Sequence, residues 1–159
     1  MHVRFSITLG SAIALMAGMP FAALHADVPA SSPAEIQKAR HHHYEELGEA
    51  SKQIRDLSRS SNPDFAAIEK AAAHIVKATV NQDQWFPKGT GPEAGKTRAL
   101  PEVWTRPADF VAAQKMFSDR APALLAAAKA KDINAVRTSF RDVGASCKNC
   151  HDTFRSPED

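Results

Sequence analysis

The chain has 159 residues, of which 43% are hydrophobic and 24% are charged, and its formal net charge at pH 7 is +2. This length suits one domain with a single buried core, so two domains are not expected. Basic and acidic residues are interleaved, and the sequence therefore predicts neither a nucleic acid nor an anionic membrane surface as a partner.

The first 26 residues are predicted to be a cleaved signal peptide. A short basic start precedes an almost wholly apolar stretch over residues 7–17, and small alanines lead to a cleavage site after Ala26. Cleavage after Ala30 and retention as an uncleaved membrane anchor are the alternatives, although glycine and proline interrupt the stretch and it is short for a span. Residues 27–159 then form the mature, exported domain.

A first helix is predicted from Ser32 to about Ser60. Ser32 and Glu35 can form a capping box, and Pro33 suits the first helical turn. The apolar stripe that follows at helical spacing consists of Ile36, His43, Leu47, Ile54 and Leu57. This pattern indicates an amphipathic helix with one face against a core.

A second helix is expected after Asn62 and Pro63, which should cap it. Its inner face consists of Phe65, Ile68, Ala72, Ile75, Val76 and Thr79. From residue 81 to about 104 the helical pattern breaks at repeated prolines and glycines, which predicts a long connection. Its aromatic side chains, Trp85, Phe86 and Trp104, indicate a loop packed on the core.

A third helix is predicted from near Pro107, with a kink at Pro122. Its inner residues are Phe110, Ala113, Phe117, Leu124 and Ala128. Asp132 can cap a fourth helix. The stripe of this helix contains Ile133, Val136, Phe140, Val143, Cys147, His151 and Phe154. The predicted fold class is therefore all-α, a four-helix bundle with one long crossover that can hold a cofactor between facing helices.

The only two cysteines lie three positions apart in SCKNCHDTFR, residues 146–155, and a histidine follows the second one. On a helix, Cys147, Cys150 and His151 share a face, so two thioether bonds and one iron–nitrogen bond can reach the same porphyrin. A structural disulfide would close a loop too short to constrain the unfolded chain much. A thioredoxin-like pair would follow a strand, and a zinc site would need a distant further ligand. Together with the export signal, the motif predicts a bundle with covalently bound haem c and its iron.

The chain resembles the class II c-type cytochromes, the family of cytochrome c′ and the low-spin cytochromes c-556. The resemblance rests on FRDVGASCKNCHDTFR, residues 140–155, and on WFPKGTGPEAGKTRALPEVW, residues 85–104, and it covers essentially the whole mature sequence. It implies haem near one end of the bundle, thioether bonds at Cys147 and Cys150, and His151 as the iron ligand.

The opposite face of the haem is where this chain departs from the family pattern. Relatives usually carry Arg-x-x-x-Met or Arg-x-x-x-Leu in the first helix, whereas this chain has Arg40 followed by Tyr44. The resemblance places Arg40 near a haem propionate and Tyr44 over the iron, and Arg155 is a second candidate for a propionate. Methionine would fill the sixth coordination position and leucine would leave it open, whereas tyrosine can bind ferric iron, donate a hydrogen bond or simply pack. His43 is an alternative iron ligand.

The leading functional prediction is one-electron transfer in the periplasm through a single covalent haem, with periplasmic redox proteins as partners and no enzymatic activity. The alternative is a five-coordinate haem protein that binds nitric oxide or carbon monoxide, with Tyr44 on the distal side. A weak peroxidase that uses His43 or Tyr44 ranks last. By resemblance, a homodimer formed through the first two helices is a further candidate.

Overall fold

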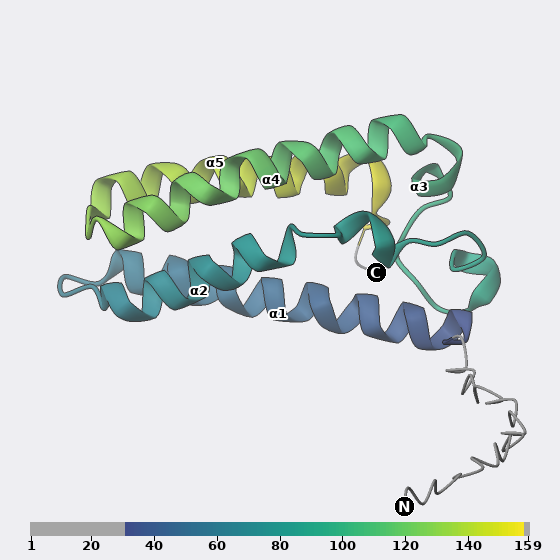
Figure 1. Cartoon of the computed structure of the whole chain (residues 1–159), viewed down its shortest axis with the longest axis horizontal. Coiled ribbons are helices and arrows are strands. Elements are labelled where there is room, and N and C mark those ends of the chain that lie inside the picture. Colours follow the sequence, from purple (N-terminus) through teal and green to yellow (C-terminus); the bar gives the residue numbers. More distant parts are fainter. Residues whose placement is uncertain (1–30, 158–159) are drawn as a thin grey trace, which may run out of the picture. The chain divides into compact units, whose positions relative to one another are not determined.

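A computed structural model describes residues 31–157, so the predicted signal peptide lies outside the described residues. The four long helices are α1 (Pro33–Arg59), α2 (Phe65–Ala78), α4 (Pro107–Lys129) and α5 (Ile133–Phe154). Three short helices lie between α2 and α4, namely η1 (Gln82–Trp85), η2 (Pro92–Ala94) and α3 (Glu102–Thr105). Successive long helices run in opposite directions and pack side by side (Figure 1). The predicted all-α four-helix bundle with one long crossover is confirmed.

Helix α1 begins with the predicted capping box. The Ser32 hydroxyl accepts the Glu35 backbone N–H at 3.3 Å, and the Glu35 carboxylate accepts the Ser32 N–H at 2.7 Å. Asp132 caps α5 as predicted, because its carboxylate accepts two backbone N–H groups at 3.0 Å. These local signals satisfy N–H groups that have no partner within the helix.

The predicted start of α2 is wrong by two residues. Asp64 is the N-cap, and its carboxylate accepts the backbone N–H of Ala67 at 3.0 Å. The backbone N–H of Asn62 instead donates to the hydroxyl oxygen of Ser60 at 3.1 Å. The carboxylate of Asp64 therefore takes the capping position that the sequence pattern gave to Asn62 and Pro63. In α4, Pro122 is exposed and the helix continues through it to Lys129.

The main core lies among the four long helices, each of which contributes at least one fully buried branched side chain. These side chains include Ile54, Ile68, Ile75, Leu124, Val136 and Val143. Burying each of them contributes about 1.5–3 kcal/mol relative to exposure. A second, smaller cluster consists of Val103, Phe110, Ala113 and Phe154, with Phe86, Trp104 and Cys150 packed against it.

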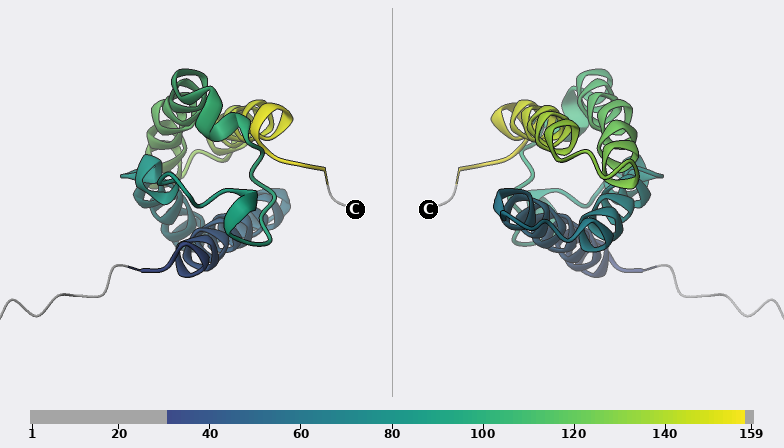
Figure 2. Two further views of the ribbon diagram at one scale, coloured as in Figure 1. Left: turned by 90° about the vertical axis from the view of Figure 1, so that its right-hand side faces the viewer. Right: turned by 90° about the vertical axis from the view of Figure 1, so that its left-hand side faces the viewer.

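The long connection crosses the end of the bundle at which α1 begins and α5 ends (Figure 2, left). It is tied to the end of α5, because Leu100 N–H donates to Phe154 O at 3.0 Å and Ser156 N–H donates to Arg98 O at 2.8 Å. The indole N–H of Trp104 donates to the carbonyl oxygen of Phe86 at 3.1 Å. The prediction that this loop packs on the core through its aromatic residues is confirmed.

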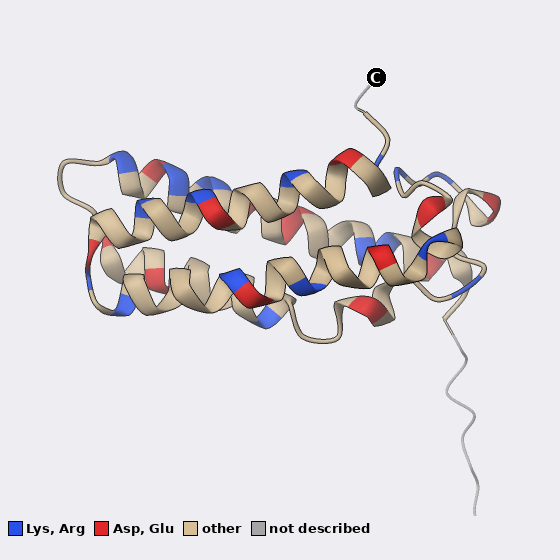
Figure 3. Cartoon of the chain, turned by 90° about the horizontal axis from the view of Figure 1, so that it is seen from above, with Lys and Arg blue, Asp and Glu red and all other residues tan. Residues whose placement is uncertain are grey.

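Positively and negatively charged side chains are interspersed along the described helices (Figure 3). Ion pairs along α4 illustrate this, with Lys115 Nζ 2.7 Å from an Asp119 carboxylate oxygen. Among residues 31–157, no helix combines the length and the apolar character that crossing a lipid bilayer requires.

Candidate haem-binding site

Helix α5 carries the Cys-x-x-Cys-His motif in its last two turns. Cys147 and Cys150 are free thiols and half-buried. Cys147 packs against the main core, whereas Cys150 packs against the second cluster of Val103, Phe110, Ala113 and Phe154. The two thiols therefore lie one helical turn apart, where the two apolar clusters meet, as the motif predicts for a helix.

The protonation of the two thiols argues against a thioredoxin-like redox pair. Burial raises the pKa of the Cys147 thiol, and burial together with the neighbouring Cys147 raises the pKa of Cys150 to about 11. Both are protonated at neutral pH, whereas a redox-active pair depends on a stabilised thiolate. Within the part of the chain that the structure describes, no three His, Cys, Asp or Glu side chains are grouped to hold a metal ion.

His151 lies at the exposed edge of α5, so its predicted place on the buried stripe is wrong. Its Nδ1 lies 3.5 Å from the Nη1 atom of Arg155, the C-cap residue of the helix. Partial desolvation lowers the pKa of His151, and the positive charges of Arg155 and Arg98 lower it further. The imidazole is therefore neutral at pH 7, which is the form that ligates a metal.

Tyr44 lies on α1 and faces the two cysteines of α5. Its ring makes an edge contact with Trp85 at 5.4 Å between centroids and a tilted contact with Phe86 at 6.2 Å. Burial raises the pKa of Tyr44 strongly, and the nearby thiols of Cys150 and Cys147 raise it further. Tyr44 is thus a neutral phenol at physiological pH, close to the attachment motif but on the opposite helix.

Arg40 is a buried cation, only 4% exposed, that ties α1 to the long connection. Its Nη1 donates to Trp85 O at 3.2 Å and to Thr90 Oγ1 at 3.1 Å, and its Nη2 donates to Thr90 O at 2.9 Å and to Thr97 Oγ1 at 3.2 Å. The guanidinium also lies 4.6 Å from the centroid of the Phe86 ring. Desolvation lowers the pKa of Arg40.

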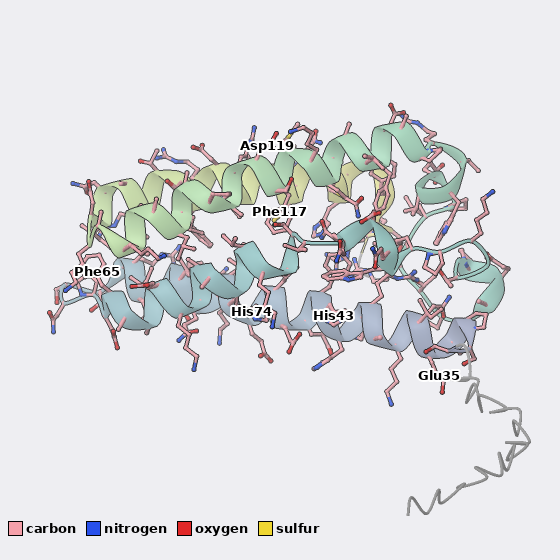
Figure 4. All side chains as sticks on the ribbon, in the orientation of Figure 1. Glu35, His43, Phe65, His74, Phe117 and Asp119 are labelled. Carbon is pink, nitrogen blue, oxygen red and sulfur yellow. The ribbon has the colours of Figure 1, made fainter. Side chains whose placement is uncertain are left out.

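All of the hydrogen-bond acceptors of Arg40 are neutral, and a buried charge is costly unless it is paired. None of the described residues gives Arg40 an anionic partner, and a haem propionate would supply one. The other groups at this site also fit haem. They are two free thiols on one helical face, a neutral imidazole and a lining of aromatic and apolar side chains. Phe117 is buried in the main core on α4 (Figure 4).

His43 does not belong to the interior, and its predicted place on the apolar stripe of α1 is wrong. Its side chain is 44% exposed, its Nδ1 lies 3.6 Å from a Glu46 carboxylate oxygen, and its ring stacks on Trp85 at 4.6 Å. Figure 4 labels His43 on α1. The inner face of this half of α1 consists instead of Gln37, Arg40 and Tyr44.

Two buried glutamines near the site were not singled out by the sequence analysis. Gln37 Nε2 donates to Thr90 O at 3.2 Å and to Gly91 O at 2.7 Å, and Gln82 Nε2 donates to Tyr44 Oη at 3.2 Å. Gln37 could have been found, since it lies three residues before Arg40 and seven before Tyr44 on one helical face. No comparable periodic signal marks Gln82, which lies in the irregular connection.

These features define a class of protein, an all-α bundle with a c-type haem attachment motif near the end of its last helix. The family model of Cytochrome C′ matches residues 35–155. The chain belongs to the cytochrome c′ family. Members of this family bind haem c covalently with its iron, and haem c is therefore the cofactor of this chain.

Known relatives agree with this assignment. A cytochrome c′ of Alcaligenes xylosoxydans xylosoxydans is 43% identical over 93 residues, which cover 58% of this chain and 71% of that protein. A cytochrome c′ of Allochromatium vinosum is 33% identical over 130 residues, covering 79% of this chain and 82% of that protein. The solved structure of cytochrome c′ from Thermochromatium tepidum is similar at a TM-score of 0.75 and 28% identity, covering 80% of this chain and 98% of that one.

Proposed function

We propose that Cys147 and Cys150 hold the haem through two thioether bonds and that His151 ligates its iron. The free thiols, their position one turn apart and the neutral imidazole support this assignment. When bound, the haem supplies a one-electron couple and a coordination position for a small ligand. Arg40 would bind a propionate, because its buried charge has only neutral partners among the described residues. Arg155 is the second propionate candidate, since it lies beside His151.

The function that we propose for the chain is one-electron transfer in the periplasm. The observation that carries it is the position of the motif: His151 is exposed and both cysteines are half-buried at the end of α5. The attachment edge of the haem would then lie near the surface, within reach of a redox partner protein. Export would depend on the signal peptide predicted in the first 26 residues. This function requires no enzymatic turnover by the chain.

Binding of a small gas is the second candidate, and Tyr44 favours it. The residue opposite the cysteines is a neutral phenol rather than methionine, and His43 lies outside the interior. One structural relative is the nitric oxide complex of a mutant cytochrome c prime from Alcaligenes xylosoxidans, with a TM-score of 0.72 and 29% identity. Another is a cytochrome c′ with a ligand-controlled dimer dissociation, with a TM-score of 0.75 and 29% identity. A homodimer and a gas ligand are proposed for this chain by that similarity. The outward position of His43 disfavours a peroxidase.

Optical spectra of the purified protein, ferric and ferrous and with and without carbon monoxide, separate the two candidates. A ferrous spectrum that the gas leaves unchanged indicates a filled sixth position and a pure electron carrier. A ferrous spectrum that shifts on addition of the gas indicates an open position. Reduction and reoxidation should be complete with one electron per chain in both cases, and a chain that takes up no electron would refute electron transfer.

The attachment residues are tested by replacing both cysteines. The Cys147→Ala/Cys150→Ala variant should carry no haem that survives a denaturing gel with haem staining, since no thiol remains to form a thioether bond. Asn149→Ala, an exposed position between the cysteines, is the matched control and should retain the stained band. A normal band in the double variant would contradict the assignment.

A further inference from the structure

Gln82 is a buried side chain, 6% exposed, at the start of η1. Its amide nitrogen donates to Tyr44 Oη at 3.2 Å across 38 positions of sequence. An amide nitrogen can only donate, so the phenolic oxygen is the acceptor in this hydrogen bond. A buried polar side chain needs such a partner, and Tyr44 provides it.

The direction of this bond determines where the proton of Tyr44 can go. A phenol has one donor and can accept at its lone pairs, and the amide of Gln82 occupies an acceptor position. In residues 31–157, no other group hydrogen-bonds to this oxygen. The hydroxyl proton therefore remains available to a second partner, while Trp85 and Phe86 hold the ring in place.

The chain presents Gln82 to the interior through an unusual turn. Asn81, just before it, has a left-handed backbone with φ of 58°. After this turn Gln82 is buried, whereas Gln84, two residues later on the same short helix, is exposed. Asparagine is among the few residues that adopt such a conformation readily, so the local sequence suits the placement of Gln82.

We propose that Gln82 is a positioning residue that sets Tyr44 as a hydrogen-bond donor to a small ligand at the haem iron. The site would then favour ligands whose outer atom accepts a hydrogen bond, such as cyanide, over carbon monoxide, which accepts poorly. This inference rests on the second candidate of the proposed function, in which a small ligand reaches the iron on the side of Tyr44. The neutral state of Tyr44 and its place opposite Cys147 and Cys150 support it.

Three variants and one control test the pair in the haem-loaded protein. Tyr44→Phe removes the hydroxyl, Gln82→Met removes the donor at similar length, and Gln82→Glu replaces a donor by a carboxylate that can accept the phenol proton. Gln84→Met is the control, because it makes the same chemical change at an exposed position of η1. Circular dichroism and haem staining establish that each variant folds and carries its haem.

Cyanide affinity of the ferric protein is the first readout. Tyr44→Phe should weaken it about fivefold, the equivalent of one hydrogen bond of about 1 kcal/mol, and should change the carbon monoxide affinity less. Gln82→Glu should weaken it at least as much, because the phenol proton turns to the carboxylate. Gln82→Met should have a smaller effect in the same direction, and Gln84→Met should have none.

The C–O stretching frequency of the ferrous carbon monoxide complex is the second readout. A donated proton near the outer atom lowers this frequency, so it should rise in Tyr44→Phe and rise further in Gln82→Glu, where an oxygen lone pair faces the ligand. Ultraviolet resonance Raman spectroscopy of the ligand-free protein tests the hydrogen bond alone, since Tyr44 is the only tyrosine of the chain. The spectrum should show that the Tyr44 oxygen accepts a hydrogen bond, and this signature should disappear in Gln82→Met.

The outcomes separate the inference from the function on which it rests. If Tyr44→Phe shifts both readouts but both Gln82 variants match Gln84→Met, Tyr44 acts without Gln82 and the inference is overturned while gas binding stands. If Tyr44→Phe itself changes nothing, the donor role of Tyr44 is refuted. If neither carbon monoxide nor cyanide binds, the gas-binding candidate fails and the inference fails with it, whatever the Raman spectrum shows.

Discussion

Arg40→Lys should destabilise the protein although it keeps the positive charge. The guanidinium makes four hydrogen bonds, two from each terminal nitrogen, to the connection between residues 85 and 97. A lysine ammonium is one atom on a shorter stem and can serve only one of these two pairs of acceptors. Two hydrogen bonds from a charged donor are then lost, each contributing about 1.5–3 kcal/mol.

Two features place the expected loss in the free energy of unfolding at the lower end of the range for each hydrogen bond. Thr90 O also accepts from Gln37, so this carbonyl keeps one partner in the variant. Thr97 is only half-buried, so water can replace the second bond in part. We therefore expect a loss of about 3 kcal/mol in the free energy of unfolding. For a domain of this size that corresponds to a fall of about 10 °C in the melting temperature.

Thermal unfolding of the haem-loaded protein measures this loss, and limited trypsin digestion locates it. Lys88 and Lys96 are exposed in the connection and should be cleaved faster once the loop is less tightly held. Arg55→Lys is the control, since Arg55 is exposed on the same helix and should change stability by less than about 0.5 kcal/mol. Equal melting temperatures and equal cleavage in the two variants would refute the role of Arg40 as the anchor of the connection.

Two further predictions concern the bundle itself. Ile54→Ala should lower the free energy of unfolding by about 2–5 kcal/mol, because Ile54 is fully buried and the change leaves a cavity; a loss below 1 kcal/mol in chemical denaturation would contradict this packing. The first turn of α1 should loosen in acid, because the Ser32 N–H bond lowers the pKa of Glu35 below its ordinary 4.5. That stabilisation is complete above the ordinary pKa and is lost as the pH falls through the lowered one. Amide exchange over residues 34–36 should show this dependence, and Glu35→Gln should abolish it; an unchanged profile in the variant would count against the capping box.

The elements that the sequence predicted well are those whose signals are local. Capping residues and apolar periodicity gave the starts of α1, α4 and α5 and the buried residues of α4, where Phe110, Phe117 and Leu124 all lie inside. The attachment motif is also local, because its residues lie within one helical turn. These features depend on neighbours a few positions away, which the sequence displays directly.

The first half of α1 could not be predicted in this way. Its inner face is polar, and Gln37 and Arg40 are buried because they hydrogen-bond to residues 45–57 positions later in the chain. Apolar periodicity therefore selected the wrong phase and placed His43 inside. The partners of Gln37, Arg40 and Tyr44 lie in a connection without periodic structure, so only the folded arrangement shows which face of the helix is buried.

The same connection explains how the two halves of the site are held relative to each other. Helix α1 packs mainly on α2, and α5 packs mainly on α4, so direct contact between α1 and α5 is limited. The connection joins them at this end, because Arg40 and Gln37 hold one part of it and the backbone of Phe154 pairs with another. Phe86, in the connection, also packs between the two halves of the site, since its ring contacts Tyr44 of α1 and Phe110 of α4. The distance between Tyr44 and the attachment motif thus depends on the long connection. The four hydrogen bonds from Arg40 hold that connection against α1.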